Sequence, residues 1–175
     1  MWRKLLGQMH NWRGRAASMR SAEGDAPAVM IALDSSASTW LFRVPRNRKA
    51  IAEFCAMVER RLPPGYAGMD VLRAFQVSFD ELLTNIVTHA REFDDHPVEV
   101  LLKREQQRIA AVIRYRGTPY DPTSRPAVDT TGGIQDREIG GLGIYLVQVM
   151  MDEFRHAYVA GYNELTLLKR LPESG

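Results

Sequence analysis

The chain has 175 residues, of which 45% are hydrophobic and 25% charged, and its formal net charge is +2. This length suits one domain with a substantial core, and the average composition excludes a disordered chain. No apolar run approaches the ~20 residues that a transmembrane helix needs. The single cysteine, Cys55, excludes an intrachain disulfide and a cysteine metal cluster. It reads as a small buried hydrophobe, and a reducing cytoplasm fits best.

The N-terminal segment differs in charge from the rest of the chain. Its first twenty residues carry five basic side chains and no acid, so the body is mildly acidic and nucleic-acid binding by the core has no electrostatic support. An amphipathic helix with Trp2, Leu5, Leu6, Met9 and Trp12 on one side would suit a membrane surface or a partner groove. A flexible tail without a structural role is the alternative. Residues 18–27 read as a linker, which predicts an extension over 1–33 and a domain over 34–175.

The first half of the domain alternates strands and helices. Residues 39–45 predict a strand that Pro45 ends. Residues 51–62 predict a helix that Asn47 or a neighbour could cap and that the Pro-Pro-Gly run at 63–65 stops. A long helix is predicted over 70–91. Residues 97–103 and 108–115 predict adjacent strands joined by a polar turn, so the helices and this hairpin should form two layers.

The second half begins with a stretch that has no periodicity. Residues 117–140 are rich in proline and glycine, and irregular segments of this length are often lids over a site. A glycine turn at 140–143 then runs into an apolar helix. Residues 154–159 and 164–171 predict a closing hairpin around a turn at 160–163.

The long helix carries a polar stripe beside its apolar face. Glu81, Asn85 and His89 recur every fourth residue, so they lie nearly above one another on the helix surface. A carboxylate and an amide so placed can serve one small site as a base and a metal ligand. A solvated helix face is the alternative for this pattern taken alone.

The glycine turn is the second candidate for chemistry. Gly140, Gly141 and Gly143 precede or open a helix, where free backbone N–H groups and the helix dipole favour phosphate oxygens. The pattern is neither a Walker loop nor a good dinucleotide fingerprint. Helix capping by glycine is the alternative.

Taken in order, these motifs resemble one family. The Glu81-x-x-x-Asn85 pair, the Gly117-Thr118-Pro119-Tyr120-Asp121-Pro122 run and the glycine turn occur as in RsbW-type anti-sigma factors, which are serine protein kinases. The resemblance covers residues 39–171. It implies an α+β two-layer sandwich with helices on one face of a mixed or antiparallel sheet, the histidine-kinase-like ATPase (Bergerat) fold.

The resemblance also implies roles for single residues. Asn85 would coordinate Mg²⁺, and Glu81 would act as the general base for phosphate transfer from ATP. The turn Gly140, Gly141, Leu142 and Gly143 would hold the phosphates, and residues 118–139 would close over them. Gly117 and Thr166 would contribute to nucleotide binding, with Thr166 near the adenine.

One position departs from the family. In the family, the strand before the first glycine motif normally ends in Asp-x-Gly, and that aspartate accepts a hydrogen bond from adenine. Here Tyr115 stands at this position, where a phenol could hydrogen-bond to a purine or stack on it. Arg114 and Arg116 beside it could favour another anion, or they could be solvated strand-end residues.

Three functions follow from the resemblance. The first is a switch kinase that phosphorylates a STAS-type antagonist protein, captures a sigma factor or another regulator, and forms a homodimer. The second is a non-catalytic relative that binds partners without ATP, as Tyr115 would favour. The third is another ATPase of the superfamily, such as a histidine-kinase catalytic domain, which the short length disfavours.

Overall fold

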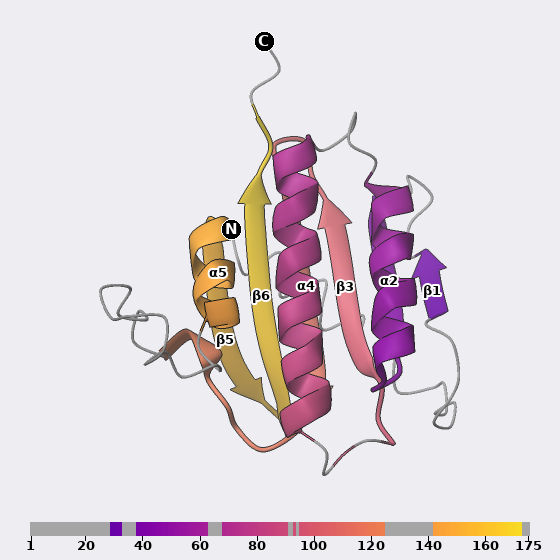
Figure 1. The fold of residues 1–175 in the computed structure, drawn as a ribbon, viewed down its shortest axis with the longest axis vertical. Coiled ribbons are helices and arrows are strands. Elements are labelled where there is room, and N and C mark those ends of the chain that lie inside the picture. The colour runs from indigo at the N-terminus through magenta and orange to yellow at the C-terminus, as the bar shows by residue number, and fades with distance from the viewer. Residues whose placement is uncertain are drawn as a thin grey trace.

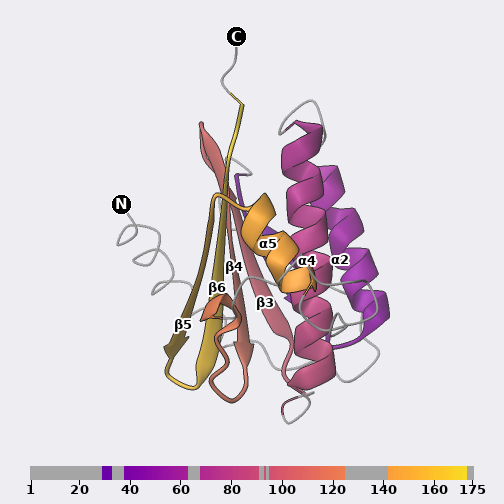
Figure 2. The ribbon, with the colours of Figure 1, turned by 60° about the vertical axis from the view of Figure 1, so that its left-hand side comes forward.

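The computed structural model describes residues 29–32, 38–62, 68–90, 93, 95–124 and 142–172. Its described strands form one six-stranded sheet in the order β1-β2-β3-β4-β6-β5, and every neighbouring pair is antiparallel. Helices α2, α4 and α5 all lie on one side of this sheet (Figures 1 and 2). The predicted α+β two-layer sandwich is therefore confirmed, with the antiparallel form of the sheet.

The predicted elements of the first half are present. They are β2 (Thr39–Val44), α2 (Arg48–Arg61), α4 (Met69–His89), β3 (Val98–Arg104) and β4 (Arg108–Arg116). Asn47 caps α2 as expected, because its side chain accepts a hydrogen bond from the backbone nitrogen of Ala50. No helix in the described residues is long and apolar enough to cross a membrane.

Two boundaries differ from the sequence-based expectation. Strand β1 (Val29–Ala32) lies inside the segment assigned to the extension, and it pairs with β2 at one edge of the sheet. The closing hairpin of β5 (Glu153–Val159) and β6 (Tyr162–Arg170) turns at Ala160 and Gly161, whose φ angles are 52° and 84°. Asn163 is therefore a strand residue, not part of the turn.

The core lies between the sheet and α4, which runs across its centre (Figure 1). Fully buried phenylalanines from three elements meet there: Phe54 packs edge-on against both Phe42 and Phe79, each with ring centroids 5.0 Å apart. Cys55 belongs to the partly buried shell of this core. Burial and then the nearby Asp80 raise the pKa of its thiol to about 11, which keeps it protonated.

The opposite side of the sheet, here called the outer face, carries its own pattern. Because side chains alternate along strands, the residues between the core positions point to this face. One cross-strand row alternates in charge and joins Arg43, Glu99, Arg114 and Glu164. The next row is Leu41, Leu101, Val112 and Thr166. Thr166 thus lies on the side of the sheet away from the helices.

Candidate active site

Helix α4 presents the predicted carboxylate and amide together. Asn85 Nδ2 donates a hydrogen bond to Glu81 Oε1 over 2.7 Å, and both side chains are half-buried. Positions four apart in a helix are neighbours, so the pair is set by the helix itself. Since the amide nitrogen faces Glu81, the Asn85 oxygen is the atom left for a metal ion.

The first turn of α5 (Leu142–Met150) packs against this pair. A Cβ atom added at Gly143 would overlap the Glu81 carboxylate, so the carboxylate keeps this place only because residue 143 is a glycine. This contact brings the base candidate to the N-terminus of α5, where backbone N–H groups favour negative charge. Gly140 and Gly141 lie outside the described residues.

A cavity of about 280 Å³ lies beside the pair, between α4, the start of α5 and the sheet. Leu82, Ile86, Ile144 and Leu165 supply most of its apolar lining, and Asn85 and His89 open onto it from α4. An apolar cavity with a few polar groups is the usual form of a site for a small molecule or a cofactor.

Tyr115 lies at the wall of this cavity, at the position where the family's aspartate was expected. Its side chain is only 4% exposed. Burial first and Tyr120 second raise the pKa of the phenol to about 12, against the opposing effect of Arg46. The hydroxyl is therefore neutral at physiological pH and can both donate and accept a hydrogen bond.

The segment after β4 forms the remaining wall. Thr118, Tyr120 and Pro122 line the cavity, and Pro122 begins the short 3₁₀ helix η2 (Pro122–Ser124). Gly117 is buried, and a Cβ atom added there would contact both the Tyr115 ring and the Asn163 amide. The rest of the predicted lid, residues 125–139, lies outside the described part of the chain.

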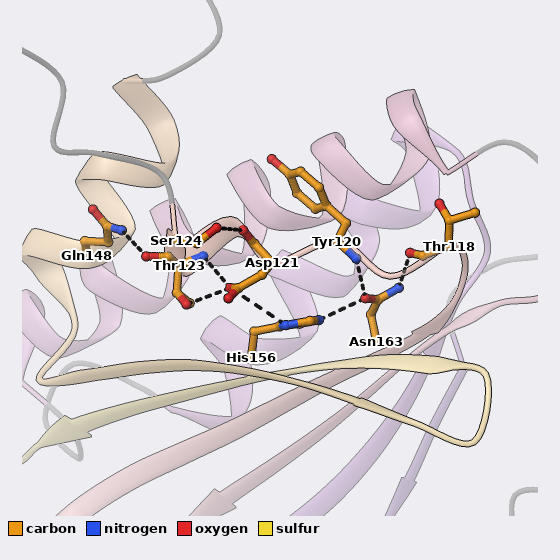
Figure 3. Close-up of polar contacts among 8 residues, drawn as sticks. All are labelled: Thr118, Tyr120, Asp121, Thr123, Ser124, Gln148, His156 and Asn163. Carbon is orange, nitrogen blue, oxygen red and sulfur yellow. Dashed lines mark hydrogen bonds and ion pairs between the residues drawn. The ribbon is translucent and has the colours of Figure 1, made fainter.

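Two residues of this site escaped the sequence analysis. Asn163 on β6 and His156 on β5 form hydrogen bonds that hold the wall from behind (Figure 3). The sequence-based prediction placed Asn163 in a turn, so it did not identify Asn163 as a residue of the site. The two-residue turn signal of Ala160 and Gly161 could have revealed it, since it puts Asn163 and Leu165 on the same side of β6.

The structure moves two predicted residues away from the cavity. Thr166 lies on the outer face, and its neighbour Leu165 lines the cavity instead. Arg114 also belongs to the outer face. Its Nη1 lies 3.0 Å from Glu99 and its guanidinium stacks 3.6 Å over the Tyr162 ring, so it does not select an anion in the cavity.

Metal binding would rest on few protein ligands. The described residues contain no group of three or more His, Cys, Asp or Glu side chains suited to a metal ion. Magnesium usually takes one or two protein ligands and completes its shell with phosphate oxygens and water. The Asn85 amide oxygen, one turn from Glu81, is the candidate for such a ligand.

Comparisons with known proteins identify the family and the fold. The histidine kinase-like ATPase domain family matches residues 44–169. The serine/threonine-protein kinase BtrW of Bordetella bronchiseptica is 32% identical over 98 residues, which are 54% of this chain and 68% of the relative. The crystal structure of the RsbU and RsbW domains of Rv1364c from Mycobacterium tuberculosis superposes with a TM-score of 0.54 at 16% identity. That match covers 83% of this chain but only 33% of the longer structure.

Proposed function

This chain belongs to the family of histidine kinase-like ATPase domains, and we propose that it is a partner-switching serine protein kinase that uses Mg-ATP. The order of the motifs predicted this family correctly. The match to a relative named serine/threonine-protein kinase supports the step from an ATPase fold to a protein kinase.

One observation carries the proposal. The Glu81 carboxylate is held by Asn85 and lies against Gly143 at the start of α5, beside an apolar cavity. A carboxylate, an amide and a helix N-terminus therefore meet at one edge of an apolar cavity. Phosphoryl transfer needs this set of groups, because its catalysis consists mainly of positioning and charge stabilisation.

In the proposed reaction, the cavity binds the adenine and the phosphates extend toward the N-terminus of α5. Glu81 accepts the proton of an incoming serine hydroxyl as that oxygen attacks the γ-phosphorus. The bond from the γ-phosphorus to the bridging oxygen breaks, and ADP leaves with the negative charge. Asn85 fixes the carboxylate through its Nδ2 hydrogen bond during this step.

Magnesium, when bound, neutralises charge on the phosphate oxygens, and the Asn85 amide oxygen is the protein atom proposed to hold it. Gly140, Gly141, Leu142 and Gly143 are proposed to contact the phosphates.

The proposed partners follow from the family. The protein substrate is a STAS-type antagonist, and the captured protein is a sigma factor or a similar regulator. We further propose that the chain acts in the cytoplasm as a homodimer, without direct contact to nucleic acid.

The first experiment is calorimetric titration with ATP and ADP, with and without magnesium. We expect magnesium-dependent binding of both nucleotides. Phosphate transfer is then measured with STAS-domain proteins of the same genome as acceptors. Glu81→Gln should bind ATP normally but lose about 100-fold or more in transfer, because only the base is removed.

Asp80→Asn is the matched control, since this exposed carboxylate lies one residue away and outside the site. It should transfer phosphate like the wild type. Asn85→Ala should abolish the effect of magnesium on ATP binding. Undiminished transfer by Glu81→Gln would refute the assignment of the base.

A second candidate function is partner capture without catalysis, which the buried Tyr115 favours. A carboxylate acceptor for adenine is replaced there by a neutral phenol. This candidate predicts no binding of ATP and partner capture that is indifferent to Mg-ATP. Magnesium-dependent nucleotide binding in the first titration would contradict it.

A further inference from the structure

The wall formed by residues 118–122 has two sides. The side chains of Thr118, Tyr120 and Pro122 line the cavity at every second position. The groups between and behind them face the β5–β6 hairpin, as Figure 3 shows. The wall is therefore an extended segment whose position depends on what holds its rear side.

Asn163 holds that rear side at two points. Its Nδ2 donates to the backbone oxygen of Thr118 over 2.8 Å, and its Oδ1 accepts from the backbone nitrogen of Tyr120 over 3.0 Å. The side chain is fully buried. A backbone carbonyl can only accept and a backbone N–H can only donate, so these two bonds fix the orientation of the amide.

The fixed amide also determines the role of His156. His156 Nε2 lies 2.9 Å from Asn163 Oδ1, and because this oxygen can only accept, Nε2 must carry the proton. His156 Nδ1 faces Asp121 Oδ1 at 3.7 Å from the other edge of the ring. The imidazole thus spans the space between β6 and the wall.

Asp121 continues the chain of contacts toward α5. Its Oδ1 accepts from the Thr123 backbone nitrogen and hydroxyl over 2.8 Å and 2.6 Å, which caps η2. Gln148 of α5 donates to the Thr123 backbone oxygen over 3.4 Å. The β5–β6 hairpin is in this way connected through the wall to the helix that carries Gly143.

We propose that Asn163 and His156 are positioning residues for the nucleotide. They hold the wall of residues 118–122 in the position that lets the adenine bind in the cavity. The inference rests on the proposed function, because it concerns the same cavity. Neither side chain is among the described residues that line the cavity, so both act through the wall. Their loss should weaken nucleotide binding and leave the chemical step intact.

The test compares ADP affinity, transfer rates and amide hydrogen exchange in the wild type and four variants. Asn163→Ala should bind ADP about 10-fold to 100-fold more weakly, since two buried hydrogen bonds are lost. Its transfer rate at saturating ATP should equal that of the wild type. The Tyr120 amide should exchange faster in this variant, even without ligand, because its acceptor is gone.

His156 is tested by a graded pair of substitutions. His156→Phe keeps a flat ring but removes the donor to Asn163, so ADP affinity should fall by about fivefold to tenfold. His156→Gln can still donate, and it should recover most of that loss. Arg155→Ala is the matched control, because this neighbour on β5 is 59% exposed and pairs with Glu153 away from the cavity.

The outcomes separate the two proposals. Wild-type affinity in Asn163→Ala, with ADP binding intact in the unmodified protein, would overturn the positioning role and leave the proposed function standing. Equal losses in His156→Phe and His156→Gln would overturn the role of His156, since a structural role of the ring needs no donor. Absence of ADP binding in the wild type would overturn the proposed function and this inference with it.

Discussion

The two walls of the cavity are built in different ways. On the α4 wall, Glu81 and Asn85 are four residues apart and bond to each other within one helix. On the wall of residues 118–122, the holding bonds join residues 43 and 45 positions apart in the chain. The first wall follows from local periodicity, and the second exists only once the closing hairpin has paired with β4.

The walls also differ in what their loss would cost. Helix α4 supplies nine buried residues, so its position is tied to the stability of the whole domain. The wall of residues 118–122, here called the loop wall, has exposed side chains at Thr118 and Tyr120 and depends on a few hydrogen bonds. We therefore expect substitutions behind α4 to act chiefly on the stability of the domain, and substitutions behind the loop wall to act chiefly on binding.

The largest expected effect comes from the core behind α4. Phe79→Ala removes a fully buried ring that packs against Phe54, and it should lower the free energy of unfolding by about 3–5 kcal/mol. Urea denaturation measures this loss. Val77→Ala, at a 36% exposed position on the same helix, is the control and should cost far less. A small loss at Phe79 would mean that α4 is not anchored by this core.

The contact between α4 and α5 should govern the chemical step. In Gly143→Ala the new methyl group takes the place of the Glu81 carboxylate, which must move. Phosphate transfer should fall by about 100-fold, because small displacements of a catalytic group have effects of this size. The melting temperature should hold, since alanine favours a helix more than glycine does.

Val149→Ala is the matched control on α5, at a position that is 61% exposed. It should transfer phosphate at the wild-type rate. Full activity in Gly143→Ala would show that the carboxylate does not react from the place where it lies in this structure.

The difference between the two walls explains how much of the site could be predicted from the sequence. The apolar period of α4 placed Glu81 and Asn85 on one stripe, and the family resemblance assigned their roles. The face of β6 depended on its register, because a shift of one residue moves every side chain to the other side of a sheet. The family resemblance assigned Thr166 to the adenine, whereas in the observed register Leu165 and Asn163 face the helices. The contact between Gly143 and Glu81 joins distant segments and left no local signal.

Substitutions at Tyr115 test whether the protein recognises the purine through a hydrogen bond. Tyr115→Phe should weaken ATP binding by about fivefold to tenfold if the hydroxyl contacts the purine, which corresponds to one hydrogen bond. Titration calorimetry measures it. Tyr158→Phe on β5, where the ring is 43% exposed and outside the cavity, should change nothing.

The reverse substitution sharpens the same point. Tyr115→Asp restores the acceptor that the family normally supplies and should tighten ATP binding. Unchanged affinity in Tyr115→Phe together with weaker binding in Tyr115→Asp would indicate that the ligand meets the Tyr115 ring by stacking. An unchanged affinity in both variants would contradict any contact between Tyr115 and the purine.

A smaller effect is expected at the hairpin turn that sets the register of Asn163. Ala160 has a φ of 52°, a left-handed conformation that costs a non-glycine residue about 1–2 kcal/mol. Ala160→Asn creates the Asn-Gly pair that such turns prefer, and it should stabilise the domain by about 0.5–1 kcal/mol in thermal melts. Ala157→Asn, at an exposed strand position of β5, should not stabilise. A lower melting temperature for Ala160→Asn would contradict the turn geometry.

The smallest effect, and the one confined to the loop wall, is its response to acid. Burial raises the pKa of Asp121, but hydrogen bonds from Thr123, with the nearby His156, outweigh it and hold the pKa below its ordinary value. A carboxyl whose pKa is lowered by folding stabilises the fold fully above its unfolded pKa of about 3.9, and that contribution disappears as pH falls through the folded value. The Thr123 amide resonance should therefore titrate below pH 3.9 by NMR, and Asp121→Asn should remove this titration. A midpoint above 3.9 would mean that the cap of η2 does not hold the carboxylate, and that the loop wall depends on Asn163 alone.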